Sequence, residues 1–179
     1  MIAGHIGGED VIIAQRAMLE ENEAYRQIIP YTVLRKGDRY AAYRRTPKGG
    51  EDRLHGQVSI GFGGHVDLVD VVFDPETSIV DLKRTIDEGS RRELEEELVM
   101  GEGVRITNFT ELDKKIVSNA NPVDRVHIGL VNIADIEGDE TQVDSGEEQL
   151  EFLGFLSVEE LKAFDTLESW TQALVEAGL

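Results

Sequence analysis

Three glutamates lie close together near the middle of the chain, in the stretch Arg92-Glu93-Leu94-Glu95-Glu96-Glu97-Leu98. In a helix, Glu93, Glu96 and Glu97 are three or four positions apart, so their carboxylates share one face. Like charges placed this way destabilise an isolated helix, whereas a hard cation such as Mg²⁺ or Mn²⁺ prefers clustered carboxylate oxygens. Arg92 can orient one of them through a bidentate ion pair. The spacing predicts a divalent metal site, and a solvated acidic helix face is the alternative.

A glycine-rich turn precedes these glutamates in the sequence. The residues Gly61-Phe62-Gly63-Gly64-His65-Val66-Asp67 follow the alternating polar and apolar run Gln57–Phe62, which predicts a strand. Glycines at the end of a strand let the backbone approach a ligand closely. The turn is therefore a second place where this chain is expected to contact a ligand.

Together the two motifs resemble those of the Nudix hydrolase family, whose box reads G-x5-E-x7-R-E-U-x-E-E-x-G-U, with U a bulky aliphatic residue. The core R-E-U-x-E-E is matched without gaps by Arg92, Glu93, Leu94, Glu96 and Glu97, and Gly63-Gly64 with His65-Val66 matches the strand-to-loop opening. The resemblance covers roughly residues 30–165, and residues 49–67 are also similar to a subgroup of predicted phosphoesterases. It implies an α/β fold, the α/β/α sandwich around a mixed β-sheet.

The sequence departs from the box pattern between its two ends. The pattern places the glycine 14 positions before the arginine, whereas Gly64 and Arg92 are 92 − 64 = 28 positions apart. We therefore expect an insertion of 14 residues within 68–83, in a single domain over 1–179 with an N-terminal extension at 1–29. Counted back from Arg92, the box glutamate is replaced by Arg84, and Val99 stands where the last glycine belongs, with Gly101 nearby.

The resemblance implies a metal-dependent hydrolase acting on a nucleoside diphosphate linked to another moiety. Mg²⁺ or Mn²⁺ would be held by the Gly64 carbonyl and the carboxylates of Glu93, Glu96 and Glu97, and the residues of catalysis would include Arg92, Glu93 and Glu96. In several family members a carboxylate after the box activates the water. The candidates here are Glu147, Glu148 and Glu151, with Glu148 the first choice.

These downstream acids also have a simpler interpretation. Residues 135–151 contain eight acids and no base, so any one of them can be merely solvated.

Positive charge that could bind a pyrophosphate is concentrated in residues 35–53, which hold seven of the 18 bases against three acids. Arg44, Arg45 and Arg53 are the candidates for clamping phosphate oxygens, although strand residues can also simply face solvent. His65, in the box loop, could contact substrate or a nearby water. A zinc site is not expected, because no two histidines have ligand spacing and the chain has no cysteine.

Composition limits the classes of protein that this chain can belong to. Among its 179 residues, 36 acids against 18 bases give a net charge of −18, which disfavours binding to a nucleic-acid polymer or an anionic membrane. The absence of cysteine excludes disulfides, a thiolate metal site and a cysteine nucleophile. No apolar run approaches the roughly 20 residues of a membrane span. We expect a cytoplasmic protein with a small-molecule diphosphate as its partner, and a homodimer is left open.

The expected elements alternate between strands and helices. Strands are expected at 9–14, 57–62, 104–111 and 123–136, with a hairpin of 31–35 and 39–45 around Lys36-Gly37-Asp38. Helices are expected at 16–25, at 79–98 with a kink or boundary at Gly89, after a capping box at Ser157, and at 167–177. This order favours a layered α/β or α+β domain.

Two other functions remain open from the sequence. Arg84, the insertion and the lost glycine would also fit a domain that keeps the fold but senses a nucleotide ligand or acts as a scaffold without turnover. A non-nucleotide diphosphate, including an isoprenoid diphosphate, is a third option. The isomerase chemistry of that branch is disfavoured because its usual cysteine is absent.

Overall fold

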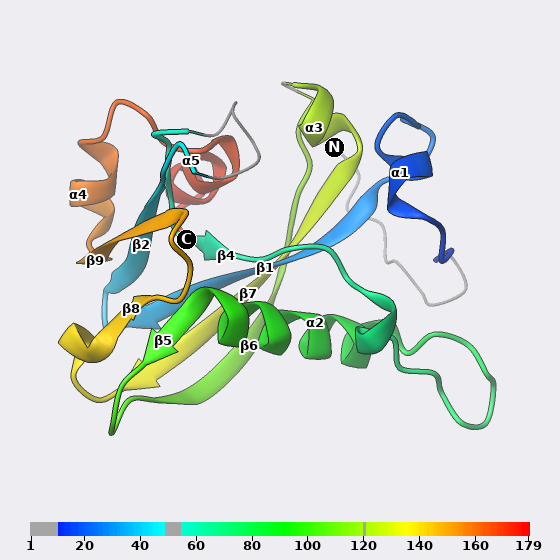
Figure 1. Ribbon diagram of the computed structural model, residues 1–179, viewed down its shortest axis with the longest axis horizontal. Coiled ribbons are helices and arrows are strands. Elements are labelled where there is room, and N and C mark those ends of the chain that lie inside the picture. Colours follow the sequence, from blue (N-terminus) through cyan, green and yellow to red (C-terminus); the bar gives the residue numbers. More distant parts are fainter. Residues whose placement is uncertain (1–10, 49–54, 120) are drawn as a thin grey trace.

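The structure, a computed structural model, describes residues 11–48, 55–119 and 121–179, and is built around a mixed β-sheet (Figure 1). The strands follow the order β3-β2-β1-β7-β6, with β4 paired to β1 and β9 paired to β2. A second, two-stranded sheet joins β5 to β8. The strands are β1 (Gln27–Lys36), β2 (Arg39–Arg45), β3 (Val58–Ser59), β4 (Gly61–Phe62), β5 (Leu98–Met100), β6 (Arg105–Ile116), β7 (His127–Glu137), β8 (Val143–Ser145) and β9 (Leu150–Leu156).

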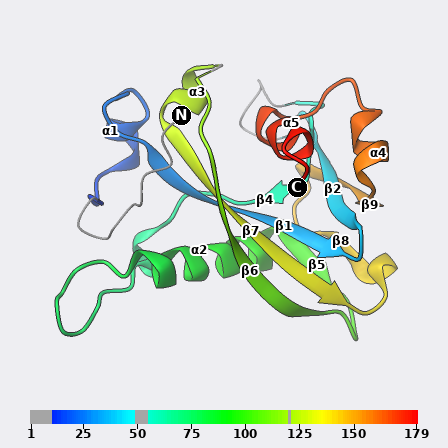
Figure 2. The same cartoon turned by 180° about the vertical axis from the view of Figure 1, so that it is seen from behind.

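The centre of the sheet is a parallel pair, and the other pairings are antiparallel. Strands β1 and β7 run parallel from the pair Gln27–His127 to the pair Arg35–Asp135. Strands β6 and β7 are antiparallel neighbours, as the view from behind also shows (Figure 2). The hairpin of β1 and β2 is confirmed, with Gly37 at φ +63° in its two-residue turn.

Helices cover both faces of the sheet, so the α/β/α sandwich is confirmed. Helix α2 packs Leu94 against one face, on a core that includes Leu34 and Phe62. On the other face, Leu161 and Trp170 pack on Tyr31 and its neighbours. The helices are α1 (Arg16–Leu19), α2 (Leu82–Glu97), α3 (Pro122–Arg125), α4 (Val158–Lys162) and α5 (Ser169–Glu176).

Helix α2 is the element that carries the predicted glutamates. It begins at the N-cap Asp81, whose side chain accepts a hydrogen bond from the backbone N–H of Arg84 (3.1 Å), and ends at Glu97. The helix runs through Gly89 without a break, where an added Cβ would lie 3.4 Å from the Pro30 side chain. Gly89 is thus a point of close approach to β1, not the expected kink or boundary.

Residues 71–81, within the segment where the insertion is expected, form a loop that projects beyond the start of α2 (Figure 1). A single bridge between Phe73 and Val80 closes it, and the backbone N–H of Asp81 donates to the Val72 carbonyl (2.8 Å). The loop is preceded by the 3-10 helix η3 (Leu68–Asp70). Its two ends therefore lie side by side, and α2 begins directly where the loop returns.

Several expected elements differ from those observed. The strand at 9–14 is wrong for residues 11–14, which are not in a strand, while residues 9 and 10 lie outside the described residues. The helix at 16–25 is reduced to α1, which buries no residue. The run 123–136 divides into α3 and β7, because Asn121 caps a helical turn with Pro122 at its start.

Within the described parts of the chain, no helix is long and apolar enough to cross a membrane.

Candidate active site

The glycine turn and the glutamate face of α2 lie against each other, as the two motifs predict. Strand β4 ends at Phe62, and the turn that follows brings Gly64 onto Glu93. A Cβ added to Gly64 would lie 2.5 Å from Glu93 Oε1, so only glycine leaves room for this approach. The Gly63 backbone also acts on the Glu97 carboxylate, where it opposes the rise of its pKa on burial. The turn and the helix together form one polar site.

Glu97 is the most buried of the three glutamates, with 8% of its surface exposed. Its Oε2 atom has no hydrogen-bond partner within the described part of the chain. Burial raises the pKa of Glu97 to about 8; Arg45 opposes this shift, whereas Glu93 and Glu147 add to it. A buried carboxylate oxygen without a partner, next to a second carboxylate, is an environment that a divalent cation would stabilise. The residues present therefore fit a hard metal ion.

Glu93 and Glu96 have different surroundings on the same helix. Glu93 is half-buried, and burial raises its pKa against the lowering effect of Arg92. Glu96 is 56% exposed, and its Oε2 lies 3.1 Å from Arg92 Nη1. In this arrangement Glu96 is therefore directed to Arg92.

Arg92 is held by an aspartate that the sequence interpretation missed. Its Nε and Nη2 atoms lie 3.0 Å from Asp70 Oδ1 and 2.9 Å from Asp70 Oδ2, in a bidentate pair. Asp70 is only 4% exposed; burial raises its pKa, but the Arg92 pair and the Asp67 backbone N–H hold that pKa below its usual value. Arg92 also donates to the His65 carbonyl (2.9 Å) and lies 2.9 Å from Glu93 Oε1. It thus ties the glycine turn to the glutamates.

Asp70 changes how the box pattern is aligned with this chain. The pattern places a carboxylate six positions after the glycine, and six positions after Gly64 is Asp70. Arg84, which counting back from Arg92 had assigned to that place, is exposed in the first turn of α2. In the structure Asp70, and not Arg84, is thus the acid that pairs with Arg92. Counting forward from the glycine would have found it in the sequence.

Of the predicted phosphate-binding arginines, the structure turns one towards the glutamates. Arg45 is largely buried, and Tyr43, Glu168 and Glu97 raise its pKa against the opposing effect of burial. Its Nη2 donates to the Tyr43 hydroxyl (3.3 Å), and its Nε has no partner in the described residues. Arg44, on the opposite face of β2, pairs with Glu151 (3.0 Å). Arg53 lies outside the described residues.

The acids after the box also separate into two environments. Glu148 is 88% exposed and pairs with Lys48 (3.0 Å), so it lies at the surface. Glu147 is half-buried, accepts a hydrogen bond from the Gln149 side chain, and acts electrostatically on Glu97. Of the three candidates, Glu147 is the one that the structure couples to the buried glutamate.

His65 belongs to a different group of side chains. Its Nε2 lies 3.0 Å from Nε2 of His127, and Glu20 Oε1 is 3.9 Å away. Burial, with Arg16 and His127, lowers the pKa of His65 to about 4, against Glu20 and Asp67. In the described parts of the chain, Glu20, His65 and His127 are the only three acid or histidine residues with ligand atoms all within 4.8 Å of one another.

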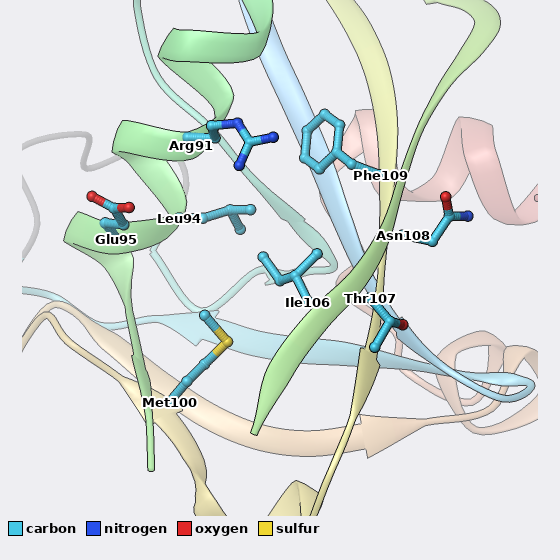
Figure 3. A pocket seen from close by; sticks show the side chains of 8 residues that line it. All are labelled: Arg91, Leu94, Glu95, Met100, Ile106, Thr107, Asn108 and Phe109. Atoms are coloured by element: carbon cyan, nitrogen blue, oxygen red, sulfur yellow. The ribbon is translucent and has the colours of Figure 1, made fainter. Parts of the chain in front are cut away.

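Two cavities lie near these groups, and neither is lined by the three glutamates. A cavity of about 250 Å³ lies between α2 and β6, where Arg91 and Leu94 face Ile106 and Phe109 (Figure 3). A larger one, of about 540 Å³, is lined by His65, Arg16 and apolar residues of the N-terminal segment and the box loop, among them Ile12, Leu19 and Leu82. The glutamate site is thus distinct from both.

A mixed sheet between two helical layers, with a glutamate-bearing helix against a glycine turn, is the arrangement of a Nudix fold. The chain belongs to the Nudix hydrolase family, whose members act on phosphoanhydride bonds. It is 31% identical over 165 residues to Protein YmaB of Bacillus subtilis (strain 168), covering 90% of this chain and 75% of YmaB.

Solved structures share this fold. Tm1382, a candidate Nudix hydrolase, superposes with a TM-score of 0.69 at 26% identity, over 93% of this chain and 77% of Tm1382. DR0079 from Deinococcus radiodurans shares the fold, with a TM-score of 0.56 at 17% identity over 96% and 95% of the two chains. No family model matches the chain.

Proposed function

We propose that this chain is a pyrophosphohydrolase dependent on Mg²⁺ or Mn²⁺ that cleaves a nucleoside diphosphate linked to another moiety, in the cytoplasm. The observation that carries the proposal is Glu97: its buried Oε2 has no partner in the described residues and lies beside a second carboxylate and a glycine turn. Such a group is costly in an apoprotein, and a bound cation offsets that cost.

The Gly64 carbonyl, Glu93 and Glu97 would hold the ion, and Glu96 would join them by turning away from Arg92. When bound, the ion would neutralise negative charge developing on the phosphate oxygens and orient the diphosphate. Arg92 keeps Glu93 in place and is itself fixed by the buried Asp70. The protein's part is thus to keep the carboxylates on one face of α2, with Arg92 compensating the charge of Glu93 and Glu96.

Substrate binding and water activation would come from two residues that act electrostatically on Glu97. The partly unsatisfied Arg45 would bind phosphate oxygens, in preference to the ion-paired Arg44. Water attacks one phosphorus, the phosphoanhydride P–O bond breaks, and a carboxylate accepts the proton of the water. We assign this last role to Glu147, because Glu148 is exposed and paired with Lys48.

The test compares two variants of one helix. With Mg²⁺ and a panel of nucleotide sugars, ADP-ribose, dinucleoside polyphosphates and nucleoside triphosphates, Glu97→Gln should lower kcat by on the order of 10²–10³-fold, because the ion loses a charged ligand. Glu95→Gln, on the exposed side of the same helical turn, should retain the activity and control for helix charge. Circular dichroism should show both variants folded.

Equal turnover by the parent and Glu97→Gln would contradict the metal assignment. Calorimetric binding of a nucleotide with Mg²⁺, without release of any product across the panel, would instead favour the sensor function.

A further inference from the structure

We propose that Glu20, His65 and His127 form a second metal site, which binds a borderline transition-metal ion such as Zn²⁺. The three residues come from separate parts of the chain: the segment after α1, the loop after the glycine turn, and the start of β7. Their ligand atoms all lie within 4.8 Å of one another. The histidines are 62 positions apart, which is why their proximity is invisible in the sequence.

His127 is held in the orientation of a metal ligand. Its Nδ1 lies 2.7 Å from the Val123 carbonyl oxygen, which can only accept a hydrogen bond. The proton of a neutral His127 is therefore on Nδ1, and the lone pair of Nε2 points the other way, towards Nε2 of His65 (3.0 Å) and the side-chain amide of Gln27 (3.3 Å). Metal-binding histidines are commonly oriented by such a bond from the second ring nitrogen to a backbone carbonyl. The residue is only 5% exposed, so its ring cannot easily reorient.

His65 places its own Nε2 at the same point. The two Nε2 atoms are 3.0 Å apart, and the rings meet at 72° in an edge arrangement instead of stacking. Two nitrogen ligands of a tetrahedral zinc ion, each at about 2.0–2.1 Å, are separated by about 3.3 Å. A shift of a few tenths of an ångström would bring the two nitrogens to that separation, and Glu20 Oε1, now 3.9 Å from His65 Nε2, would have to move closer. The competing arrangement has hydrogen bonds donated to His127 Nε2 by His65 (3.0 Å) and by the Gln27 amide (3.3 Å), which an ion would have to displace.

Glu20 supplies the anionic third ligand. Its Oε1 lies 3.9 Å from His65 Nε2 and accepts a hydrogen bond from Arg16 Nε (2.8 Å), which orients the carboxylate. Two imidazoles and a carboxylate suit Zn²⁺, whereas Mg²⁺ prefers oxygen ligands only. This donor set therefore selects a different ion from that of the α2 glutamates.

Three protein ligands leave one coordination position open. His65 lines the cavity of about 540 Å³, so a water or a ligand atom could reach the ion from that side. Because the ligands join the segment after α1 to the box loop and to β7, metal binding should also stabilise the folded chain against unfolding.

The experiment uses Co²⁺ as a coloured probe for the zinc site, with the full chain stripped of metal and millimolar Mg²⁺ present to occupy the carboxylate site. We expect one equivalent of Co²⁺ to bind with the strong visible absorption of a low-coordinate site, Zn²⁺ to displace it, and Zn²⁺ to raise the Tm. No substrate is involved, so the result is independent of the proposed hydrolase activity.

Variants assign the ligands. Glu20→Gln and His65→Gln should each weaken Co²⁺ binding by at least about 10-fold, since even loss of an outer-shell partner costs that much. Glu21→Gln, an exposed neighbour, and Glu97→Gln, in the other site, should bind Co²⁺ as the parent does. Undiminished binding by the first two variants would overturn the proposal. So would the absence of stoichiometric binding, which would leave the hydrogen bonds of His127 with His65 and Gln27 as the role of the group.

Discussion

Glu97 shows how a single residue can link stability to metal binding. Its carboxylate is buried beside Glu93, and Arg45 compensates its charge only in part, since the net effect raises the pKa to about 8. Between the ordinary pKa near 4.5 and this value, the folded protein retains a proton that the unfolded chain has released. Stability must therefore fall as the pH rises through this range.

This yields a prediction for the metal-free protein. In EDTA, urea unfolding of the parent should show stability declining relative to Glu97→Gln between about pH 5 and pH 8, by on the order of 3 kcal/mol, because glutamine carries no buried charge. Excess Mg²⁺ should remove most of the difference. A difference between the two proteins that does not change with pH would show that Glu97 is not protonated in the fold.

The residues of the site could be predicted to different extents. Arg92 and the glutamates are contiguous on one helix, where spacing alone decides which side chains share a face. Asp70 precedes Arg92 by 22 positions, and only the path of the intervening loop brings the two together. Glu147 and Glu148 are neighbours in the sequence, so the sequence alone could not show which of the two side chains turns inward.

At the scale of elements, the glycines of β4 and of the turn after it are packed closely against different neighbours. A Cβ on Gly64 would meet only the flexible end of the Glu93 side chain, at 2.5 Å, whereas a Cβ on Gly61 would lie 1.8 Å from the buried Tyr31 ring. The same small substitution thus meets a buried ring when made in β4 and a flexible carboxylate when made in the turn that follows it.

We predict opposite outcomes for these two glycines. Gly64→Ala should retain its Tm within a few degrees but lower Mg²⁺-dependent hydrolysis by at least about 10-fold, because it displaces a charged ligand of the ion. Gly61→Ala should lower the Tm strongly, since overpacking a core costs about 1–3 kcal/mol or more. Thermal denaturation and rate measurements on both variants test these two expected outcomes. Full activity in Gly64→Ala would mean that the turn does not position Glu93.

Elements with a strong local signal agree with their prediction, and those that depend on partners do not. The Lys36-Gly37-Asp38 turn and the Ser157 capping box are local and are found as expected. The run Gln57–Phe62 was expected to be one strand but is split at Ile60, whose backbone N–H donates to the Thr171 side chain (3.1 Å). The apolar run at 11–14 finds no strand to pair with, so its β propensity has no effect.

At the scale of the whole molecule, the described part of the basic segment, residues 35–48, has most of its bases paired with acids instead of forming an open positive patch. Strand pairing of β1 with β7 and of β2 with β9 brings its side chains onto the acidic segment 135–151. The resulting ion pairs are Arg35–Asp135, Lys36–Glu140, Arg39–Glu140, Arg44–Glu151 and Lys48–Glu148. The long-range field that an anionic substrate meets is therefore that of a molecule with a net charge of −18.

Salt should consequently accelerate capture of the substrate. Raising NaCl from about 20 mM to about 200 mM, at constant free Mg²⁺, should increase kcat/KM for a diphosphate substrate by roughly 2–10-fold, because it screens the repulsion. The kcat at saturating substrate should change little, which separates this effect from damage to the site. A steady fall of kcat/KM with salt would indicate that local positive charge governs the encounter.

The parallel pairing at the middle of the sheet also sets the order in which a newly made chain can acquire its shape. Gln27 and His127, which face each other across β1 and β7, are separated by 127 − 27 = 100 residues. A ribosome adding about 5–20 residues per second needs roughly 5–20 s to make that interval. Throughout this interval β1 lacks β7, the strand with which it pairs in the folded protein, so the centre of the sheet can form only after most of the chain has been made.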